Sequence, residues 1–192
     1  GIKRVVVSTY QAVSGAGQAG LEELDKQVRQ YLDKVPVTPQ VFQHQIAFNL
    51  IPHIDDFVEE NYTREEMKMV WETRKIMGVP DLKVAPTAVR VPVFRSHSES
   101  INIETQRPLE ADEARRILES APGVIVLDDP TAKIYPMPWF TSNRDEVFVG
   151  RIRQDITLDN GLAMWVAADQ IRKGAATNSI QIAEIVVQQN LY

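Results

Sequence analysis

The chain has no cysteine among its 192 residues. This absence excludes a disulfide framework, a zinc–thiolate site and a thiol nucleophile supplied by these residues, so any thiol chemistry must come from outside the chain. An excess of basic charge is also missing, because 21 lysines and arginines stand against 26 aspartates and glutamates, a net charge of -5. With no basic patch in the sequence, binding to nucleic acid is disfavoured.

Long apolar runs are absent as well. The longest, Gly161 to Ala168, is far shorter than the roughly 20 residues that cross a bilayer, and no basic segment followed by an apolar one opens the sequence. We therefore expect a cytoplasmic protein with no membrane-embedded part. No fixed-period repeat, low-complexity tract or Gly/Ser linker divides the chain, so we expect one domain over residues 1–192.

Strand-type and helix-type patterns are both present. Short β-branched or alternating runs predict strands, and apolar residues spaced by three and four predict helices. The best-marked helix begins at Thr63, which forms a capping-box pattern with Glu66, and ends at Gly78. Strands are predicted over residues 2–7, 86–94, 100–105, 124–127, 147–156 and 162–168, helices over residues 21–32, 63–78, 110–120 and 174–189, and irregular structure over residues 35–57.

These elements are intermixed without strict strand–helix alternation. Such an order favours an α+β fold, in which a mixed, largely antiparallel sheet is backed on one face by helices. Residues 162–168 are apolar at nearly every position, and we interpret them as a strand covered on both faces, although periodicity alone also permits a buried helix.

Ionisable residues gather where one predicted strand ends and the next begins. Arg90, Arg95, His97 and Glu99 lie within ten positions of one another. Strand alternation gives Arg90 and His97 opposite parity, so the chain must bend or bulge between them if the two side chains are to meet. A histidine there suits acid–base chemistry, and its plain alternative is a hydrogen-bonded structural side chain.

Two further features have both a functional and a plain interpretation. Glu72 and Lys75 are three positions apart on the best-marked helix, so they form either a solvated ion pair or a paired site for an amino group and an anion. Gln11, in a Gly-rich stretch after a strand, is a candidate ligand-orienting amide, but Ser14-Gly15-Ala16-Gly17 matches neither a P-loop nor a dinucleotide fingerprint. His44 and His53 have no carboxylate cluster nearby, so no metal site is predicted.

Taken together, the chain resembles the C-terminal, substrate-binding and dimerisation domain of the aspartate-semialdehyde dehydrogenase family. The resemblance implies the α+β fold that this domain shares with the C-terminal domain of glyceraldehyde-3-phosphate dehydrogenase, and a homodimer formed through the sheet. It also implies that an N-terminal NADP-binding domain and its catalytic cysteine are missing here. Five stretches, in family order, carry the resemblance: residues 8–17, 47–55, 72–76, 90–99 and 172–178.

The family enzyme reduces L-aspartyl 4-phosphate with NADPH to L-aspartate 4-semialdehyde and phosphate, a step towards lysine, threonine, methionine and isoleucine. By resemblance, His97 is the catalytic acid–base residue and Gln11 orients the thioacyl intermediate. Arg90 binds the substrate α-carboxylate. Glu72 meets the substrate α-amino group, and Lys75 binds the phosphate. Because the cysteine is absent, we expect no turnover from the isolated chain.

The resemblance also places Gly174 and Asn178 at the nicotinamide end of NADP. Gly174, at the start of a predicted helix, offers free N–H groups.

One alternative is the related reductase of N-acetyl-glutamyl phosphate, whose acylated amine would not need a carboxylate such as Glu72 and in which the Arg-to-His spacing seen here is not expected. The other is a non-catalytic dimerisation module, and the partners expected throughout are a small-molecule substrate and a second copy of the chain.

Overall fold

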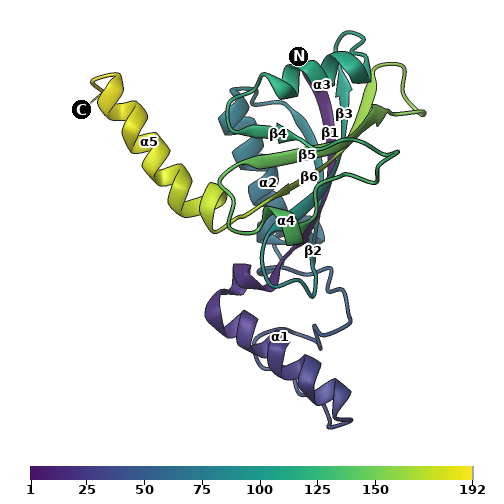
Figure 1. The fold of residues 1–192 in the computed structure, drawn as a ribbon, viewed down its shortest axis with the longest axis vertical. Helices are drawn as coiled ribbons and strands as arrows, with labels where there is room; N and C mark the ends of the chain where they lie inside the picture. The colour runs from purple at the N-terminus through teal and green to yellow at the C-terminus, as the bar shows by residue number, and fades with distance from the viewer. Residues whose placement is uncertain (192) are drawn as a thin grey trace.

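Six strands form one sheet in the order β2-β1-β3-β6-β5-β4 (Figure 1). The structure is a computed structural model, and it describes residues 1–191. Three of the five neighbouring pairs are antiparallel and two, β1 with β2 and β4 with β5, are parallel. The predicted α+β fold with a mixed, largely antiparallel sheet is therefore confirmed. The strands are β1 Ile2–Gln11, β2 Lys83–Arg90, β3 His97–Thr105, β4 Val124–Val126, β5 Val147–Gln154 and β6 Gly161–Ala168.

The four predicted helices are all present. The capping box at the start of the second is formed, since Thr63 Oγ1 accepts from the Glu66 N–H and the Glu66 carboxylate accepts from the Thr63 N–H, and Gly78 ends this helix at a φ of 63°. A helix of four residues was not predicted, because it is too short to show a helical period. The helices are α1 Gly17–Leu32, α2 Arg64–Met77, α3 Ala111–Glu119, α4 Pro138–Thr141 and α5 Thr177–Gln188, with short 3-10 turns η1 Val13–Ala16 and η2 Glu59–Asn61 and a π-helical turn η3 Arg172–Ala176.

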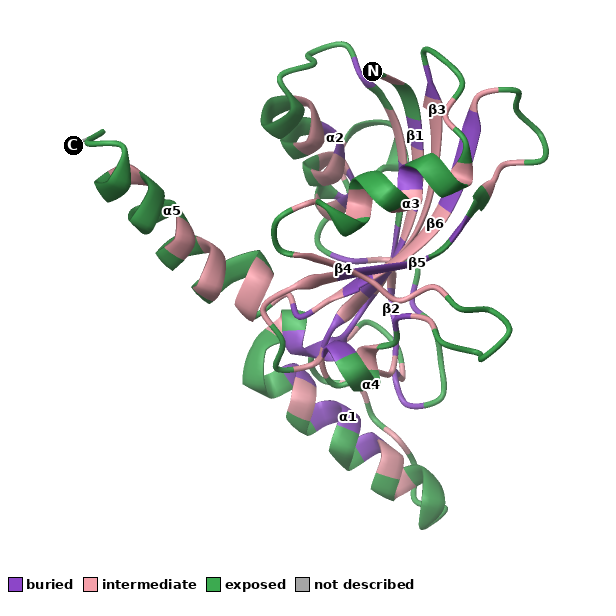
Figure 2. Ribbon diagram, turned by 45° about the horizontal axis from the view of Figure 1, so that its top comes forward, coloured by how far each residue is buried: buried purple, intermediate pink, exposed green. Residues whose placement is uncertain are grey.

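Helices α2 and α3 cover the same face of the sheet (Figure 2). One apolar cluster packs Met69 of α2 against Val5 and Val7 of β1, and another packs Ala114 of α3 against strands β5 and β6. Ile103 belongs to both clusters, which places the two helices side by side over a continuous core. The strand predicted over residues 162–168 is confirmed as β6, which lies between β3 and β5. It is covered only in part, because Met164, Trp165 and Val166 are half-buried.

The opposite face of the sheet is covered only in part by the described residues. Trp165 of β6 donates from its indole N–H to the Pro136 carbonyl (3.0 Å) and packs on Tyr10 with ring centroids 5.3 Å apart. Further along β1 and β3, side chains such as Val6, Ser8 and Ser100 stay half-exposed. This face is therefore available for packing against another surface.

The outer edge of β2 is closed by α2 and by a nearby loop. Alternate residues of an edge strand direct their backbone groups outward, and here the Ala88 N–H donates to Glu66 (3.1 Å) while the Leu82 carbonyl accepts from Arg74 Nε (2.9 Å). Of the two outward residues between them, Pro86 has no N–H to offer. At the end of the strand, Arg90 exchanges both backbone hydrogen bonds with Ile51. These contacts fix α2 beside β2.

Residues 35–57 are irregular, as predicted, yet side chains from α1 hold them in place. The Gln27 amide oxygen accepts from the N–H groups of Ile46 and Ala47 (2.8 and 3.1 Å), and Leu24 packs against the same residues. Helix α1 extends from one end of the sheet and α5 projects away from its side (Figure 1). Among residues 1–191, no helix combines the length and the hydrophobicity needed to cross a membrane.

Candidate functional site

The sheet register brings Gln11, Arg90 and His97 together at one end of three neighbouring strands. Gln11 ends β1 opposite Arg90, which ends the parallel strand β2. On the other side of β1, Tyr10 is opposite Ser98, so His97 begins β3 next to Gln11. The bend that the sequence requires between Arg90 and His97 is a loop over residues 91–96, which crosses the end of β1. Its backbone is fixed there by Val91 N–H to Gln11 O (3.0 Å) and Val13 N–H to Val93 O (2.9 Å).

His97 is held in one tautomer by the backbone. The Ala12 N–H donates to Nδ1 of His97 at 3.1 Å, so in the neutral ring the proton sits on Nε2. Burial of the ring, and then the positive charge of Arg90, lower the pKa of His97 to about 4, although Glu65 and Asp169 partly oppose this. At neutral pH the ring is therefore uncharged and Nε2 is a hydrogen-bond donor.

Arg90 is a buried cation without a carboxylate partner within ion-pair distance among residues 1–191. One of its N–H groups donates to the Ala12 carbonyl at 2.7 Å, and the Phe42 ring lies 5.9 Å from the guanidinium carbon. Burial lowers the pKa of Arg90, an effect that Glu65 partly offsets. A guanidinium in this state suits a bound carboxylate, since its remaining N–H groups form a planar fork.

Gly15 leaves the space that Arg90 and His97 occupy. A Cβ at this position would lie 2.8 Å from Nη1 of Arg90 and 3.6 Å from Nε2 of His97. The first distance is too short for any side chain to be accepted without moving the guanidinium. The sequence marks a Gly-rich stretch here, but nothing in it singles out Gly15, because its neighbours come from distant strands.

These side chains line a polar cavity of about 310 Å³. Two charged residues of α2 enter it: Glu65 accepts from the Gln11 side-chain amide at 3.2 Å, and Lys68 contacts Glu65 at 3.1 Å and Asp55 at 3.7 Å. The hydrogen bond to Glu65 raises the pKa of Lys68. The cavity is lined by Gln11, Gly15, Ile54, Asp55, Glu65, Lys68, Arg90 and His97.

Glu72 and Lys75 are not brought into this cavity. Both are exposed on α2, and the residues at the cavity are Glu65 and Lys68, which have the same spacing seven positions earlier. Seven residues are close to two helical turns, so the earlier pair shares the direction of the later one but lies about 10 Å nearer the start of the helix. The sequence does carry a signal for the position of the earlier pair: the capping box sets the start of the helix at Thr63, so Glu65 lies in its first turn.

Comparison with known families identifies the kind of domain to which this sheet and cavity belong. A family model described as semialdehyde dehydrogenase, dimerisation domain, matches residues 1–173. The chain belongs to this family. The resemblance that the sequence indicates is therefore confirmed, and the sheet and cavity are those of a semialdehyde dehydrogenase dimerisation domain.

Individual semialdehyde dehydrogenases are close in sequence and structure. The aspartate-semialdehyde dehydrogenase of Aquifex aeolicus is 57% identical over 192 residues, which are 100% of this chain and 56% of that protein. The crystal structure of Vibrio cholerae aspartate semialdehyde dehydrogenase II complexed with ASA has a TM-score of 0.94 at 46% identity over 98% of this chain and 55% of that one. The Candida albicans enzyme with NADP has a TM-score of 0.71 at 26% identity, covering 100% of this chain and 52% of that one. The chain thus spans little more than half the length of these relatives.

Gly174 and Asn178 of this dimerisation domain lie outside the cavity. Gly174 is inside the π-helical turn η3 and is not the start of the helix. This turn begins at Arg172, and just before it the Asp169 carboxylate accepts from the N–H groups of Ile171 and Arg172 (3.0 and 3.3 Å), so those donors are already satisfied. Asn178 is within hydrogen-bond reach of Lys173 (3.4 Å). Their contact with a cofactor stays a prediction.

His44 and His53 are not among the residues that line the cavity. The His53 ring stacks on Phe57 at 4.3 Å between centroids. In the described part of the chain, no three histidine, cysteine, aspartate or glutamate side chains are grouped so that they could hold a metal ion.

Proposed function

We propose that this chain is the substrate-binding part of an NADP-dependent aspartate-semialdehyde dehydrogenase that reduces L-aspartyl 4-phosphate to L-aspartate 4-semialdehyde and phosphate. The observation that carries the proposal is the cavity at the strand ends, where an unpaired buried arginine, a lysine, a glutamate and a tautomerically fixed histidine meet. The Vibrio cholerae relative bound to ASA supports it, because that enzyme has the same fold.

Each end of the substrate has a chemically matched partner in this cavity. Arg90 takes the α-carboxylate on its free N–H fork, and Glu65 takes the α-ammonium group. Lys68 takes the phosphate once the ligand competes with Asp55 for its ammonium group. We assign these last two roles to Glu65 and Lys68 in place of Glu72 and Lys75, whose exposed positions on α2 give them no access to the ligand.

The reaction needs a thiolate that displaces phosphate from the acyl phosphate, and the 192 residues contain no cysteine. That group therefore belongs to the rest of the parent protein. Neutral His97 faces the reacting centre with its Nε2 proton and donates to the developing negative charge. A thiolate or acyl phosphate beside the ring raises the pKa of His97, so the ring can accept and return a proton. Gln11, fixed by Glu65, orients the intermediate.

NADPH supplies the hydride that reduces the thioacyl carbonyl when the cofactor is bound. The relatives are nearly twice as long as this chain, and we assign most of the cofactor contacts to the rest of the parent protein. This chain contributes an edge contact from Gly174 and Asn178. The 2.6 Å hydrogen bond from Gln170 to Ser14 supports that contact, because it brings the start of η3 beside the loop that lines the cavity.

The free ammonium group separates this proposal from an N-acetyl-glutamyl-phosphate reductase. That substrate carries an acylated, uncharged nitrogen and would gain nothing from the Glu65 carboxylate. The decisive experiment compares Glu65→Gln with the matched control Glu72→Gln in the parent enzyme. We expect Glu65→Gln to weaken substrate binding and lower kcat/KM by about tenfold or more, while Glu72→Gln stays near wild type. The reverse pattern would overturn the assignment.

We also infer that the half-exposed sheet face carries the dimer contact that the family description names. A second copy placed against Val6, Ser8 and Ser100 would cover the side of the sheet opposite α2 and α3. Ser100→Arg should then convert a dimer into a monomer in light scattering at micromolar concentration, without changing the far-ultraviolet circular dichroism. A wild-type monomer under these conditions contradicts the inference.

A further inference from the structure

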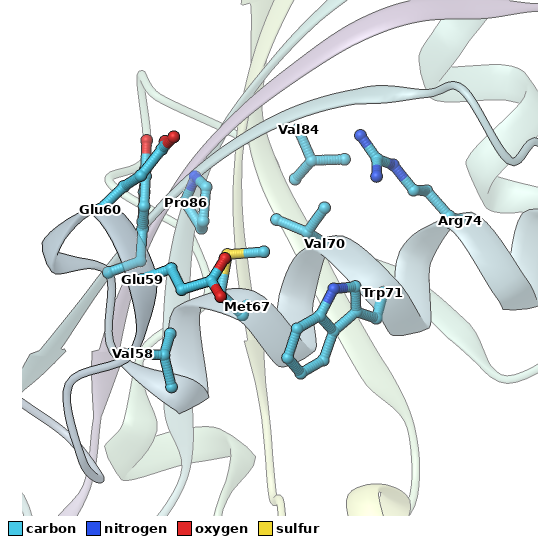
Figure 3. A pocket seen from close by; sticks show the side chains of 10 residues that line it. Val58, Glu59, Glu60, Met67, Val70, Trp71, Arg74, Val84 and Pro86 are labelled. Atoms are coloured by element: carbon cyan, nitrogen blue, oxygen red, sulfur yellow. The ribbon is translucent and has the colours of Figure 1, made fainter.

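A second cavity, of about 530 Å³, lies between α2 and the outer edge of β2 (Figure 3). It shares no lining residue with the polar cavity at the strand ends. Its volume is in the range of ordinary small-molecule sites. The proposed function gives it no role, so it is a separate feature of the domain.

The floor and walls of this second cavity are apolar. Met67, Val70 and Trp71 face it from α2, and Val84 and Pro86 face it from β2 (Figure 3). Val70 is buried, but Trp71 is 52% exposed. A large aromatic ring that the core does not cover can instead pack against a ligand.

The two ends of the cavity carry opposite charge. At one end, Arg74 uses Nε to donate to the Leu82 carbonyl (2.9 Å), and within residues 1–191 it has no carboxylate partner. At the other end are the exposed carboxylates of Glu59 and Glu60, which also have no ion-pair partner in the described chain. Figure 3 shows Arg74 and Glu60 at opposite ends of the apolar floor.

This arrangement is built before any ligand binds. The backbone bond to Leu82 fixes the Arg74 guanidinium, leaving its terminal N–H groups for a carboxylate. The glutamate-bearing loop is closed by the Val58 N–H to Tyr62 carbonyl bond (2.8 Å) and by a bridge between Phe57 and the helix-capping Thr63. Pre-positioned groups of this kind lower the ordering cost of binding.

We propose that this second cavity binds an apolar monocarboxylate of small-molecule size. The carboxylate pairs with Arg74, and the apolar body lies on Trp71 and Met67. The far end of the ligand, neutral or cationic, lies near Glu59 and Glu60. Those carboxylates repel a second negative charge, so dicarboxylates and phosphorylated compounds are selected against. The site therefore takes a different class of ligand from the dianionic acyl phosphate of the polar cavity.

The test follows the indole N–H signal of Trp71 in two-dimensional ¹H–¹⁵N NMR spectra of this chain, assigned with Trp71→Phe. Three probes share a phenyl ring: 4-phenylbutyrate has one carboxylate, 4-phenylbutylamine has none and phenylsuccinate has two. We expect 4-phenylbutyrate to shift the Trp71 signal saturably, and the other two to bind about tenfold more weakly or not at all. No saturable shift with 4-phenylbutyrate, or equal affinity for all three, would overturn the proposal.

Two variants separate recognition from a general loss of structure. Arg74→Gln should abolish the preference for 4-phenylbutyrate over the amine, whereas Arg116→Gln, an exposed arginine on α3, should leave it unchanged. Because Arg74 also holds Leu82, the exposed Glu60→Gln provides a variant with no structural contact to lose. It should tighten phenylsuccinate binding several-fold towards that of 4-phenylbutyrate. An unchanged phenylsuccinate affinity in Glu60→Gln would contradict the role of the acidic end.

Discussion

Ala12 and His97 are joined by a hydrogen bond of 3.1 Å in which a backbone N–H donates to the ring nitrogen Nδ1. A backbone N–H cannot accept a proton, so the bond is lost when Nδ1 becomes protonated. Together with burial and the charge of Arg90, this contact favours the neutral ring. The fold thereby fixes both the tautomer and the direction in which His97 can give a proton.

The protonation of His97 should follow from these contacts. In the free chain, the ring signals of His97 should titrate with a pKa of about 4, and an anion bound in the polar cavity should raise that value because the opposite charge favours the protonated ring. The measurement is an NMR titration of the histidine ring protons with and without inorganic phosphate. A His97 pKa that stays near 6.5 in the free protein would contradict the structure.

The same pKa has a consequence for stability. The unfolded chain binds a proton at His97 near pH 6.5 and the folded chain only near pH 4, so the unfolded state holds more protons between these values. The contribution of His97 is therefore complete above pH 6.5 and is lost as the pH falls towards 4, by at most about 3 kcal/mol. Denaturation of wild type and His97→Gln across this range measures it, and the stability of the variant should depend less on pH.

Gly15→Ala should weaken binding of carboxylate ligands in the polar cavity while leaving the fold intact. The new methyl group would lie 2.8 Å from Nη1 of Arg90, so the guanidinium must move from its bond to the Ala12 carbonyl. Calorimetry with L-aspartate 4-semialdehyde should show a loss of about tenfold or more. Gly78→Ala is an informative contrast, because no atom lies near that position, so any effect there comes from its φ of 63° and not from the ligand site. Unchanged affinity in Gly15→Ala would mean that Arg90 does not hold the ligand in the geometry seen here.

The sequence predicts the helices and strands of this fold better than it predicts which residues line the polar cavity. Capping and periodicity are local, so α2 and the strand at residues 162–168 were found from the sequence alone. The meeting of Gln11 with Arg90 depends on the pairing of β1 with β2, which no local pattern records, and was available only through the family resemblance. The resemblance gave the substrate-binding roles to Glu72 and Lys75, whereas Glu65 and Lys68 line the cavity. The same i,i+3 pair occurs twice on α2, seven residues apart, and only the tertiary structure shows which copy reaches the strand ends.

Asp55→Asn should increase the affinity of the polar cavity for phosphate. Asp55 lies 3.7 Å from Lys68 and competes with an incoming anion for its ammonium group. Asparagine keeps the size of the side chain and tolerates the φ of 67° found at this residue. We expect a two- to threefold tighter phosphate affinity, the scale of a partly exposed ion pair, measured by ³¹P NMR titration. Asp56→Asn, a change at the exposed neighbour, should leave the phosphate affinity unchanged. If both variants bound phosphate equally more tightly, the effect would come from the change in net charge and not from the contact between Asp55 and Lys68.

Glu23→Gln should destabilise the domain and loosen the segment that covers Arg90. The buried Glu23 carboxylate accepts from three successive backbone N–H groups, those of Gln40, Val41 and Phe42. Phe42 in turn lies over the Arg90 guanidinium. A neutral amide has only one oxygen acceptor and would turn an N–H₂ group towards these donors, so the loss should be about 1–3 kcal/mol.

Chemical denaturation measures that loss, and hydrogen exchange of the three amides localises it to the loop. Glu22→Gln removes the same charge from the adjacent, exposed position on α1 and should cost less than about 0.5 kcal/mol. If Glu23→Gln and Glu22→Gln had the same free energy of unfolding, Glu23 would affect stability only through the net charge of the protein. If Glu23→Gln lowered stability without faster exchange at residues 40–42, the contribution of Glu23 would lie in α1 itself. That result would contradict the proposal that Glu23 fixes Phe42 over Arg90.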